Sequence, residues 1–418
     1  MTTKLYWHDS HCTRFTARVM DGFVQDGRRV VVLDQSAFYP GGGGQPSDTG
    51  TLNTTRVLTV SAADDGRILH HLEQDIPFTP GETVSGEVEW SRRLEMLQQH
   101  TGQHILSQAF WHLYGAETKG FRIFEQAAEI DLTLDLPPEA LAAAIAQAED
   151  LANRVVFEDR DVRVHLVTPE EAAHLPLRKE AQSALRPRSG AQETFEADGV
   201  RVIEIADFDW SPCGGTHAQR TGEVGLIAVR SWERAKRMTR VQFVCGIRAL
   251  RDYRAANWTA TGVARRCSVG RDEAPEAVDR LLEAHKHLER RTRTLSELAA
   301  TAEARELVEA TPALQNRRVV ARLFDDRDFD ELKLLAHRLV AHQGVIALLA
   351  TRTHDLVRLV FARSADLTVE VNTLLNAVCQ QLDGRGGGKA DFAQGGGTRP
   401  AIVEQVLATA VTALMEQQ

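Results

Sequence analysis

Two short motifs of histidine and cysteine constrain the fold more than any other feature of the sequence. The first is His100-Thr101-Gly102-Gln103-His104, within a segment that predicts a helix from an N-cap at Ser91 to a stop at Gly115. The second is Cys213-Gly214-Gly215-Thr216-His217, in a tight loop between two predicted strands. Histidines four apart share one helix face, so both can reach one ion. Together the motifs supply three nitrogens and one sulfur, a set that suits tetrahedral Zn²⁺. The two motifs lie far apart in the sequence, so they cannot form a zinc finger, whose ligands are close together. The fold must instead bring a helix and a distant loop together.

These residues do not determine whether such a zinc ion would be structural or catalytic. Four protein ligands normally close the shell, which favours a structural ion, whereas a catalytic ion needs an expandable shell or one weak ligand. Zinc proteases carry a glutamate directly after the first histidine of the helix as the general base. Here that position is Thr101, which cannot serve as a base, so we expect no peptide hydrolysis.

Length and composition indicate a globular chain of several domains. The chain has 418 residues, too many for one hydrophobic core, and 43% of them are hydrophobic and 26% charged. We find no apolar run of eighteen residues and no signal peptide at the start, so we expect no membrane span. The five cysteines are few, odd in number and scattered, which predicts a reducing, cytoplasmic location.

The order of the predicted elements indicates a multidomain α+β fold. Residues 1–90 predict a small β-barrel with a glycine-rich loop at 41–50, and residues 91–255 predict an α+β domain that binds the zinc. Residues 256–312 predict a helical arm, since Leu281, Leu288, Leu295 and Ala302 recur every seven residues, a pattern that allows a coiled coil. Residues 313–418 predict a separate small α/β domain that includes a long glycine-rich loop and ends in a helix.

Two basic features are candidate contacts for nucleic acid. The glycine-rich segment 383–397 fails the phosphate-loop pattern, but Arg385, Lys389 and Arg399 beside it suit a phosphodiester backbone; a mobile linker is the alternative. Eight basic residues lie between Arg230 and Arg254, although the net charge of the chain is −9. A solvated basic face explains that run equally simply.

Several motifs in a fixed order resemble the editing region of alanyl-tRNA synthetase and its free-standing AlaX-type homologues of the large form. They are the glycine loop at 41–50, the two zinc motifs, the segment 201–209 that leads into the second motif, and Thr221-Gly222-Glu223 after it. The C-terminal Ala393-Gln394-Gly395-Gly396-Gly397 is similar to the domain that ends the synthetase. The resemblance covers nearly the whole chain.

The resemblance implies an enzyme that edits mischarged tRNA. It implies one Zn²⁺ per chain at His100, His104, Cys213 and His217, and hydrolysis of the terminal aminoacyl ester of Ser-tRNA(Ala) or Gly-tRNA(Ala). Since the aminoacylation domain does not fit ahead of residue 1, we expect no aminoacylation. We expect the zinc to orient the substrate rather than to carry a hydroxide. Our candidate tRNA contacts are Arg237, Arg240, Arg385, Lys389 and Arg399, and the arm or the terminal domain is a candidate homodimer contact.

The substrate contacts that we expect lie in the barrel loop and after the zinc helix. Gly43, Gly44 and Gln45 are the candidates in the loop. Many synthetases carry Gln-Lys-Gly-Ser after the helix, where this chain has Thr118-Lys119-Gly120-Phe121. The hydroxyl of Thr118 can still bind a seryl side chain, and Lys119 lies beside it, but Phe121 leaves the preference between serine and glycine open. Two other functions compete: a catalytically silent tRNA-binding module with a structural zinc, and a general zinc esterase that does not need residues 270–418.

Overall fold

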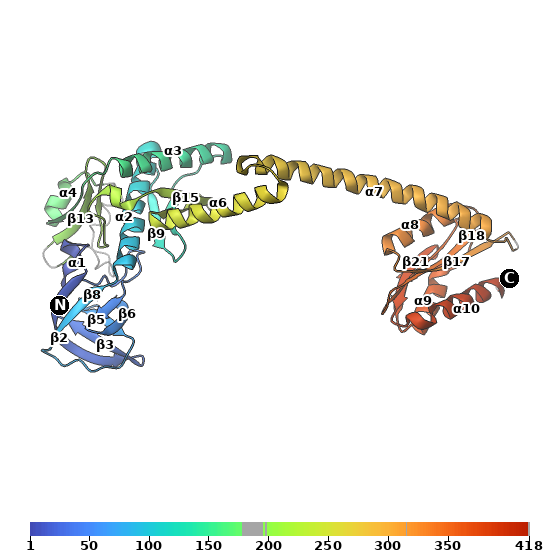
Figure 1. The fold of residues 1–418 in the computed structure, drawn as a ribbon, viewed down its shortest axis with the longest axis horizontal. Coiled ribbons are helices and arrows are strands. Elements are labelled where there is room, and N and C mark those ends of the chain that lie inside the picture. The colour runs from blue at the N-terminus through green and yellow to red at the C-terminus, as the bar shows by residue number, and fades with distance from the viewer. Residues whose placement is uncertain (178–194, 197–198, 315, 417–418) are drawn as a thin grey trace. The chain divides into compact units, whose positions relative to one another are not determined.

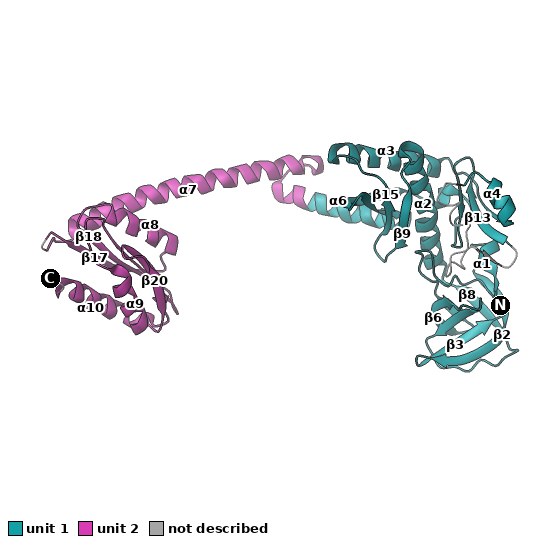
Figure 2. Ribbon diagram, turned by 180° about the vertical axis from the view of Figure 1, so that it is seen from behind, with its two compact units in different colours: residues 1–262 teal, residues 263–418 magenta. Residues whose placement is uncertain are grey.

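The computed structural model describes residues 1–177, 195–196, 199–314 and 316–416, and the chain divides into two compact units (Figures 1 and 2). The first unit is Met1–Gly262 and the second is Val263–Gln418. The fold is multidomain α+β, as expected. Among the described residues, none of the helices combines the length and the apolar character needed to span a membrane.

The first unit begins with a closed six-stranded barrel, which confirms the predicted small barrel. Its strand order is β2-β3-β7-β6-β5-β8. The strands are β2 (Arg14–Gln25), β3 (Arg28–Leu33), β5 (Gly50–Leu52), β6 (Thr55–Ala62), β7 (Ile68–Leu72) and β8 (Thr83–Val88). Asp26 and Gly27 connect β2 to β3 with positive φ at both positions, the geometry of a tight hairpin turn. Strands β1 (Thr3–Lys4) and β4 (Gln35–Ser36) and helix α1 (Leu5–His8) lie outside this barrel.

Helix α2 (Trp90–Tyr114) is the centre of the first unit. Every residue from Met96 to Phe110 is buried, so the helix is enclosed on all sides, including its polar residues. Gly115 ends the helix in the left-handed conformation, as predicted. The predicted N-cap at Ser91 is wrong: Glu89 precedes the helix, and Ser91 lies inside the first turn, where its hydroxyl donates to Glu89.

Strands of two sheets and helix α3 pack against α2 in the described part of the first unit. One sheet has the order β15-β16-β10-β9, and the other has β11-β13-β12 with β14 paired to β13. The sequence predicts a helix after Pro137-Pro138 that runs to about Asn153 and a strand near 155–167. The helix instead continues to Phe157 on a run of buried apolar residues, so the strand begins later, at Val162. The elements are β9 (Thr118–Ile123), β10 (Ala128–Leu132), α3 (Pro138–Phe157), β11 (Val162–Val167), α4 (Pro169–His174), β12 (Phe195–Glu196), β13 (Gly199–Ile205), β14 (Asp209–Pro212), η1 (Thr221–Val224), β15 (Ile227–Ala235), β16 (Met238–Cys245) and α6 (Ile247–Cys267).

A buried ion pair joins α2 to the loop of the barrel. Arg93 Nη2 lies 2.5 Å from Asp48 Oδ2, and both side chains are inaccessible to solvent. Arg93 also donates to the backbone oxygens of Ser10 and Ala37, while Asp48 accepts from the backbone of Tyr39. These hydrogen bonds satisfy both charged groups, which makes their burial tolerable. They fix the glycine-rich loop of the barrel against the helix that carries the first zinc motif.

The second unit is a five-stranded sheet with helices on both faces. Its order is β17-β18-β19-β21-β20, with β17 and β18 parallel and the remaining pairs antiparallel. Residues of β18 alternate between the two faces: Ile346 and Leu348 pack in the core with α9 and α10, whereas Ala347 and Leu349 pack in the core with α8. The elements are η2 (Arg271–Glu273), α7 (Ala274–Ala310), β17 (Arg318–Asp325), α8 (Phe329–Val340), β18 (Val345–Arg352), β19 (Val357–Arg363), α9 (Val371–Gln381), β20 (Arg385–Gly388), β21 (Phe392–Gly397), η3 (Pro400–Ile402) and α10 (Val403–Glu416).

The glycine-rich segment 383–397 is a pair of strands, so both the flexible loop and the linker that we expected there are wrong. Strands β20 and β21 pair antiparallel and complete the sheet. The glycines are needed for close packing rather than for flexibility. A Cβ on Gly386 would lie 2.7 Å from Leu375 Cδ2, and one on Gly395 would lie 2.6 Å from Cys379 Sγ. Because glycine has no Cβ atom, α9 can approach the two strands closely.

The long helix predicted for residues 270–310 is confirmed as α7. Leu281, Leu288 and Leu295 of the predicted heptad are all more than half exposed. The helix therefore presents apolar side chains to solvent, and the coiled coil itself stays a prediction.

Candidate metal centre

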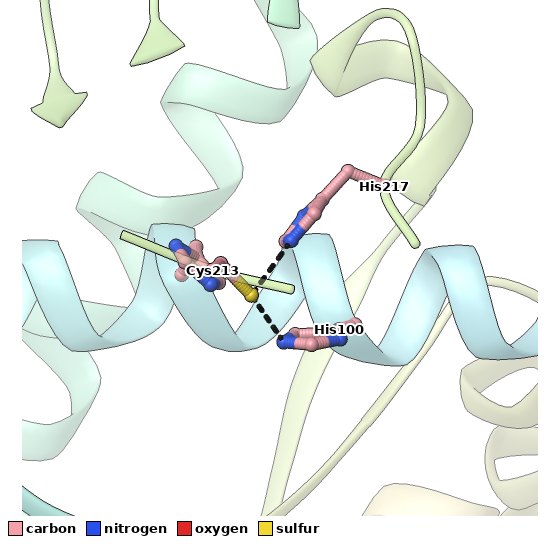
Figure 3. A group of neighbouring side chains, drawn as sticks. His100, Cys213 and His217 are labelled. Carbon is pink, nitrogen blue, oxygen red and sulfur yellow. Dashed lines mark hydrogen bonds between the residues drawn. The ribbon is translucent and has the colours of Figure 1, made fainter. Parts of the chain in front are cut away.

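The fold brings the two predicted zinc motifs together. His100 and His104 project from α2, while Cys213 and His217 lie on the loop after β14. One ligand atom from each of the four residues lies within 4.8 Å of every other, and the four side chains are largely buried. Cys213 Sγ lies 3.4 Å from His100 Nε2 and 3.3 Å from His217 Nε2 (Figure 3).

These separations fit a tetrahedral zinc ion. Zinc–nitrogen and zinc–sulfur bonds of usual length place the ligand atoms along a tetrahedral edge about 3.5 Å apart. The observed sulfur–nitrogen distances of 3.4 and 3.3 Å lie close to that value. One thiolate and three imidazoles also form a donor set that zinc prefers. The residues present therefore fit the ion that the sequence motifs predict.

Each of the three histidines is held through its other ring nitrogen. Nδ1 of His100 lies 2.7 Å from Gln45 Oε1, and Nδ1 of His104 lies 3.2 Å from Asp209 Oδ2. Nδ1 of His217 lies 3.3 Å from the hydroxyl of Thr101. Such partners orient the rings and direct Nε2 toward a metal. All three Nδ1 atoms are thus engaged with the protein.

Asp209 and Thr101 are functional candidates that sequence reasoning missed. Asp209 is 1% exposed and accepts a hydrogen bond from Ser211, so its carboxylate is fixed beside His104. The available signal was an acid at the start of a short strand, four residues before Cys213. Thr101 lies inside the first motif, where we considered it only as a failed general base. Its hydroxyl also accepts from the backbone of Ala218, which ties α2 to the second motif.

Two glycines of the motifs are required by close packing at the centre. A Cβ on Gly215 would lie 2.2 Å from His100 Cε1 and 2.9 Å from Gln45 Oε1. A Cβ on Gly102 would lie 2.3 Å from the sulfur of Cys245 on β16. Only glycine therefore lets the loop cover His100 and lets α2 lie against the sheet.

The electrostatics of the cluster favour a thiolate. Burial raises the pKa of the Cys213 thiol, but His100 and His217 outweigh burial and hold that pKa well below its usual range. Burial lowers the pKa of His217. For His104 burial also lowers the pKa, but the hydrogen bonds to Asp209 and Cys213 outweigh it and raise the pKa. A thiolate is the form of cysteine that binds metal, and binding there would displace protons.

A buried arginine holds the backbone of the second motif in place. Arg201 is 0% exposed, and its Nη1 donates to the backbone oxygens of Cys213 and Gly215 at 2.6 and 2.9 Å. Its Nε donates to the backbone oxygen of Trp7. These bonds hold the backbone of the loop between the predicted ligands Cys213 and His217.

The barrel loop reaches the centre through Gln45. Its amide contacts both His100 and Thr216. Gly44 accepts a hydrogen bond from Ile123 of β9, and a Cβ on Gly44 would lie 2.3 Å from the backbone oxygen of Phe121. Gly43 is exposed at the tip of the loop. The loop is thus held between the metal centre and β9.

Strand β9 carries the residues that we expected after the zinc helix. The ring of Phe121 lies 5.2 Å from the ring of His100. A bulge in β9 puts Thr118 opposite Leu132 and Phe121 opposite Ile130, so both point to the core face of the sheet. Within the described part of the chain, the hydroxyl of Thr118 is buried and has no hydrogen-bond partner. Lys119 instead pairs with Glu117 at 2.6 Å.

The residues expected to bind tRNA are distributed over both units. Arg237 is exposed at the turn between β15 and β16, whereas Arg240 is paired with Asp131 at 2.8 Å. Arg385 and Lys389 are exposed on β20 and directly after it, and Arg399 lies 3.8 Å from Asp383. The charge of Arg240 is therefore largely compensated, and Arg237 carries the less compensated charge of the first pair.

Comparison with known families assigns three stretches of the chain. Residues 12–92 match the family "tRNA synthetases class II (A)", and residues 200–242 match "Threonyl and Alanyl tRNA synthetase second additional domain". Residues 316–416 match the "DHHA1 domain". The second match includes the Cys213–His217 loop.

Individual relatives cover nearly the whole chain. The alanyl-tRNA editing protein AlaX-L of Pyrococcus horikoshii is 30% identical over 410 residues, which are 94% of each chain. The alanine–tRNA ligase of Pyrobaculum neutrophilum is 34% identical over 414 residues, 94% of this chain but 42% of that ligase. The chain thus spans less than half the length of that ligase. The crystal structure of the C-Ala domain from Aquifex aeolicus alanyl-tRNA synthetase is 28% identical, covers 25% of this chain and 95% of that domain, and has a TM-score of 0.23.

Proposed function

The chain belongs to the AlaX-type alanyl-tRNA editing proteins of the large form, relatives of the editing and C-terminal domains of alanyl-tRNA synthetase, and we propose that it hydrolyses mischarged tRNA(Ala). The bond cleaved is the ester between the amino acid and the terminal ribose, and seryl and glycyl esters are the substrates. Water adds to the ester carbonyl, the ribose oxygen leaves and takes a proton, and free amino acid and tRNA result. The reaction takes place in the cytoplasm.

The observation that carries this proposal is the buried convergence of His100, His104, Cys213 and His217, with each histidine oriented by a second partner. These four residues would hold Zn²⁺, and its positive charge would help to orient the ester, a role we favour over hydroxide formation because four protein ligands leave little room for a bound hydroxide. An aminoacyl ester is already activated, so positioning provides much of the remaining rate enhancement.

Two residues of β9 are candidates for contact with the aminoacyl group. The ring of Phe121 lies against His100 and forms an apolar wall there. The buried hydroxyl of Thr118 on the same face is available for the hydroxyl of a seryl group. A site that hydrogen-bonds a substrate hydroxyl can reject the analogue that lacks it, which supports preference for serine over alanine. Preference for glycine over alanine would require steric exclusion of a methyl group.

The recognition of tRNA and the assembly of the protein are parts of the same proposal. Arg237 on the first unit and Arg385, Lys389 and Arg399 on the second provide exposed positive charge for the phosphate backbone. The exposed Leu281, Leu288 and Leu295 of α7 support a homodimer through the arm. Sedimentation of the full chain and of a variant with these leucines replaced by lysine tests the dimer: the variant should sediment as a monomer.

The test of the function is deacylation of seryl-, glycyl- and alanyl-tRNA(Ala) by the purified full chain before and after removal of zinc. We expect loss of serine and glycine with alanine spared, loss of activity on chelation, and recovery on adding Zn²⁺. Folded, zinc-loaded protein that cleaves none of the three would overturn the proposal.

A closed shell of four protein ligands favours one alternative, a tRNA-binding module whose zinc is structural. A His104→Ala variant separates the two functions. For a deacylase, the wild-type protein hydrolyses the esters, whereas the His104→Ala variant still binds tRNA but no longer hydrolyses them. A silent module instead binds tRNA in both forms and hydrolyses in neither.

A further inference from the structure

The amide of Gln45 makes three contacts at the metal centre. Its Oε1 lies 2.7 Å from His100 Nδ1 and 3.2 Å from the backbone nitrogen of Thr216. Its Nε2 donates to the hydroxyl of Thr216 at 2.8 Å. Gln45, His100 and Thr216 are all buried, with exposures of 2%, 3% and 0%. The side chain is thus enclosed between the ligand helix and the ligand loop.

The backbone of Thr216 determines which way the amide points. A backbone N–H can only donate, so the atom of Gln45 that faces it must be the oxygen. That same oxygen faces Nδ1 of His100 and can only accept from it. Nδ1 must therefore carry the hydrogen, and the lone pair of His100 is on Nε2, the nitrogen 3.4 Å from Cys213 Sγ (Figure 3).

Gln45 is itself held rigidly by the loop that carries it. The backbones of Gly42 and Gln45 exchange two hydrogen bonds, and Gly44 accepts from Ile123 of β9 at 2.8 Å. Asp48, three residues later, is paired with Arg93 on α2. Arg93 and His100 are seven residues apart and so lie on the same side of α2. The helix thus fixes the loop at one point, and the loop fixes the imidazole of the helix at another.

We propose that Gln45 is a positioning residue that fixes the tautomer and orientation of His100 for the metal. A loop of the barrel would then contribute directly to metal binding. This inference deepens the proposed function, but it rests only on its metal site and not on the tRNA substrate. It also revises the expectation from the sequence, which assigned Gln45 to contact with the substrate. Oε1 of Gln45 already faces two donors, Nδ1 of His100 and the backbone nitrogen of Thr216. We therefore assign this oxygen to orienting His100 and not to a contact with the ester.

The test compares metal binding by two variants of the full chain. Gln45→Met keeps the size of the side chain but removes the acceptor, and Gln45→Glu keeps an acceptor beside His100. Zinc affinity is measured by competition with a chromophoric chelator, and geometry by the visible absorption of the Co²⁺-loaded protein. Loss of an outer partner of a ligating histidine costs about 10- to 100-fold in metal affinity. We expect that loss and an altered Co²⁺ spectrum for Gln45→Met, and affinity within a few-fold of wild type for Gln45→Glu.

Gln99→Met is the matched control. Gln99 lies on α2 and is buried like Gln45, and its amide makes two hydrogen bonds, donating to the backbone oxygen of Cys245 and accepting from its nitrogen. Within the described part of the chain, its side chain makes no hydrogen bond to any of the four predicted metal ligands. We expect this variant to lose stability but to keep the wild-type zinc affinity and Co²⁺ spectrum.

Three results would overturn the inference. The first is a Gln45→Met protein with wild-type zinc affinity and spectrum that loses hydrolysis alone, which would make Gln45 a substrate contact. The second is an equal loss of affinity in Gln45→Met and Gln99→Met. The third needs no variant: nitrogen-15 NMR of the zinc-loaded wild type that finds the hydrogen of His100 on Nε2. If metal binding behaves as expected but no aminoacyl-tRNA is cleaved, the inference stands and the proposed function fails.

Discussion

Oδ2 of Asp209 lies 3.2 Å from Nδ1 of His104, and both side chains are buried. The carboxylate therefore orients one of the predicted metal ligands and would make it a better donor to a metal. We expect Asp209→Asn to weaken zinc affinity by about 10- to 100-fold, because an amide is a poorer partner for the imidazole. Chelator competition measures the change.

Asp207→Asn is the control for that variant. Asp207 is exposed two residues earlier and has a φ of +54°, which asparagine also tolerates. The zinc affinity of this control should equal that of the wild type. An equal drop in both variants would mean that the effect arises from charge in the segment and not from the contact with His104.

Thr118→Val tests the buried hydroxyl on β9. Valine has nearly the same shape but no hydroxyl, and the hydroxyl of Thr118 has no partner within the described part of the chain. Removing a buried unsatisfied group is neutral or stabilising, so the melting temperature should stay the same or rise. Hydrolysis of seryl-tRNA(Ala) should fall about tenfold or more, while glycyl-tRNA(Ala) is hydrolysed as before. An equal fall for both substrates would exclude a contact with the serine hydroxyl.

Gly102→Ala tests the close contact between α2 and β16. Alanine gains about 1 kcal/mol of helix propensity, but its Cβ would lie 2.3 Å from Cys245 Sγ. We expect the overpacking to dominate, with a net loss of about 1–2 kcal/mol in the free energy of unfolding. The double variant with Cys245→Ala should recover much of that loss in a denaturant titration. Additive effects of the two substitutions would show that the sulfur is not the obstacle.

His70 should make the stability of the first unit depend on pH. Burial lowers the pKa of His70 to about 4, and the ring is held by Ser36 and by the backbone of Val31. Between pH 6.5 and about 4 the unfolded chain binds the proton and the folded chain does not, so stability falls as pH falls through that window. The difference in pKa corresponds to about 3 kcal/mol at pH 4.

Denaturant titrations at several pH values measure that dependence. A His70→Gln variant should lose stability less steeply than the wild type between pH 6.5 and 4, whatever its stability at pH 7. His8→Gln is the control, since His8 is exposed in α1, and it should follow the wild-type curve. Parallel curves for His70→Gln and wild type would assign the acid sensitivity to other groups.

The sequence predicted the four side chains that the structure brings together, because their chemistry and spacing are local. Two histidines four apart on a helix, and a cysteine and a histidine around two glycines, each define half of a site. It could not predict Asp209 or Thr101 as partners, because those contacts depend on how α2 meets the loop. The sequence indicated Gln45 as a candidate residue but not its contacts with His100 and Thr216, because those contacts depend on how the barrel loop meets α2 and the second motif.

The errors in the fold have a similar origin. The glycines of residues 383–397 indicated a loop because glycine has a low strand propensity. In the structure the packing of α9 against Gly386 and Gly395 outweighs that propensity. The helix after Pro137-Pro138 extended beyond its expected end because its last turn, Val155 and Val156, is buried in the core. In both places tertiary packing decided what local preference could not.

The division of the predicted metal ligands between α2 and the loop after β14 has a consequence for synthesis of the chain. The ribosome completes His100 and His104 well before it reaches Cys213, and at usual elongation rates the interval lasts roughly 5–20 s. During that time Gln99 and His104 lack the partners supplied by Cys245 and Asp209. Over this interval we expect the nascent chain to need protection, provided by chaperones, or shielding against wrong metals. Two histidines on one helix turn bind Cu²⁺ more tightly than Zn²⁺.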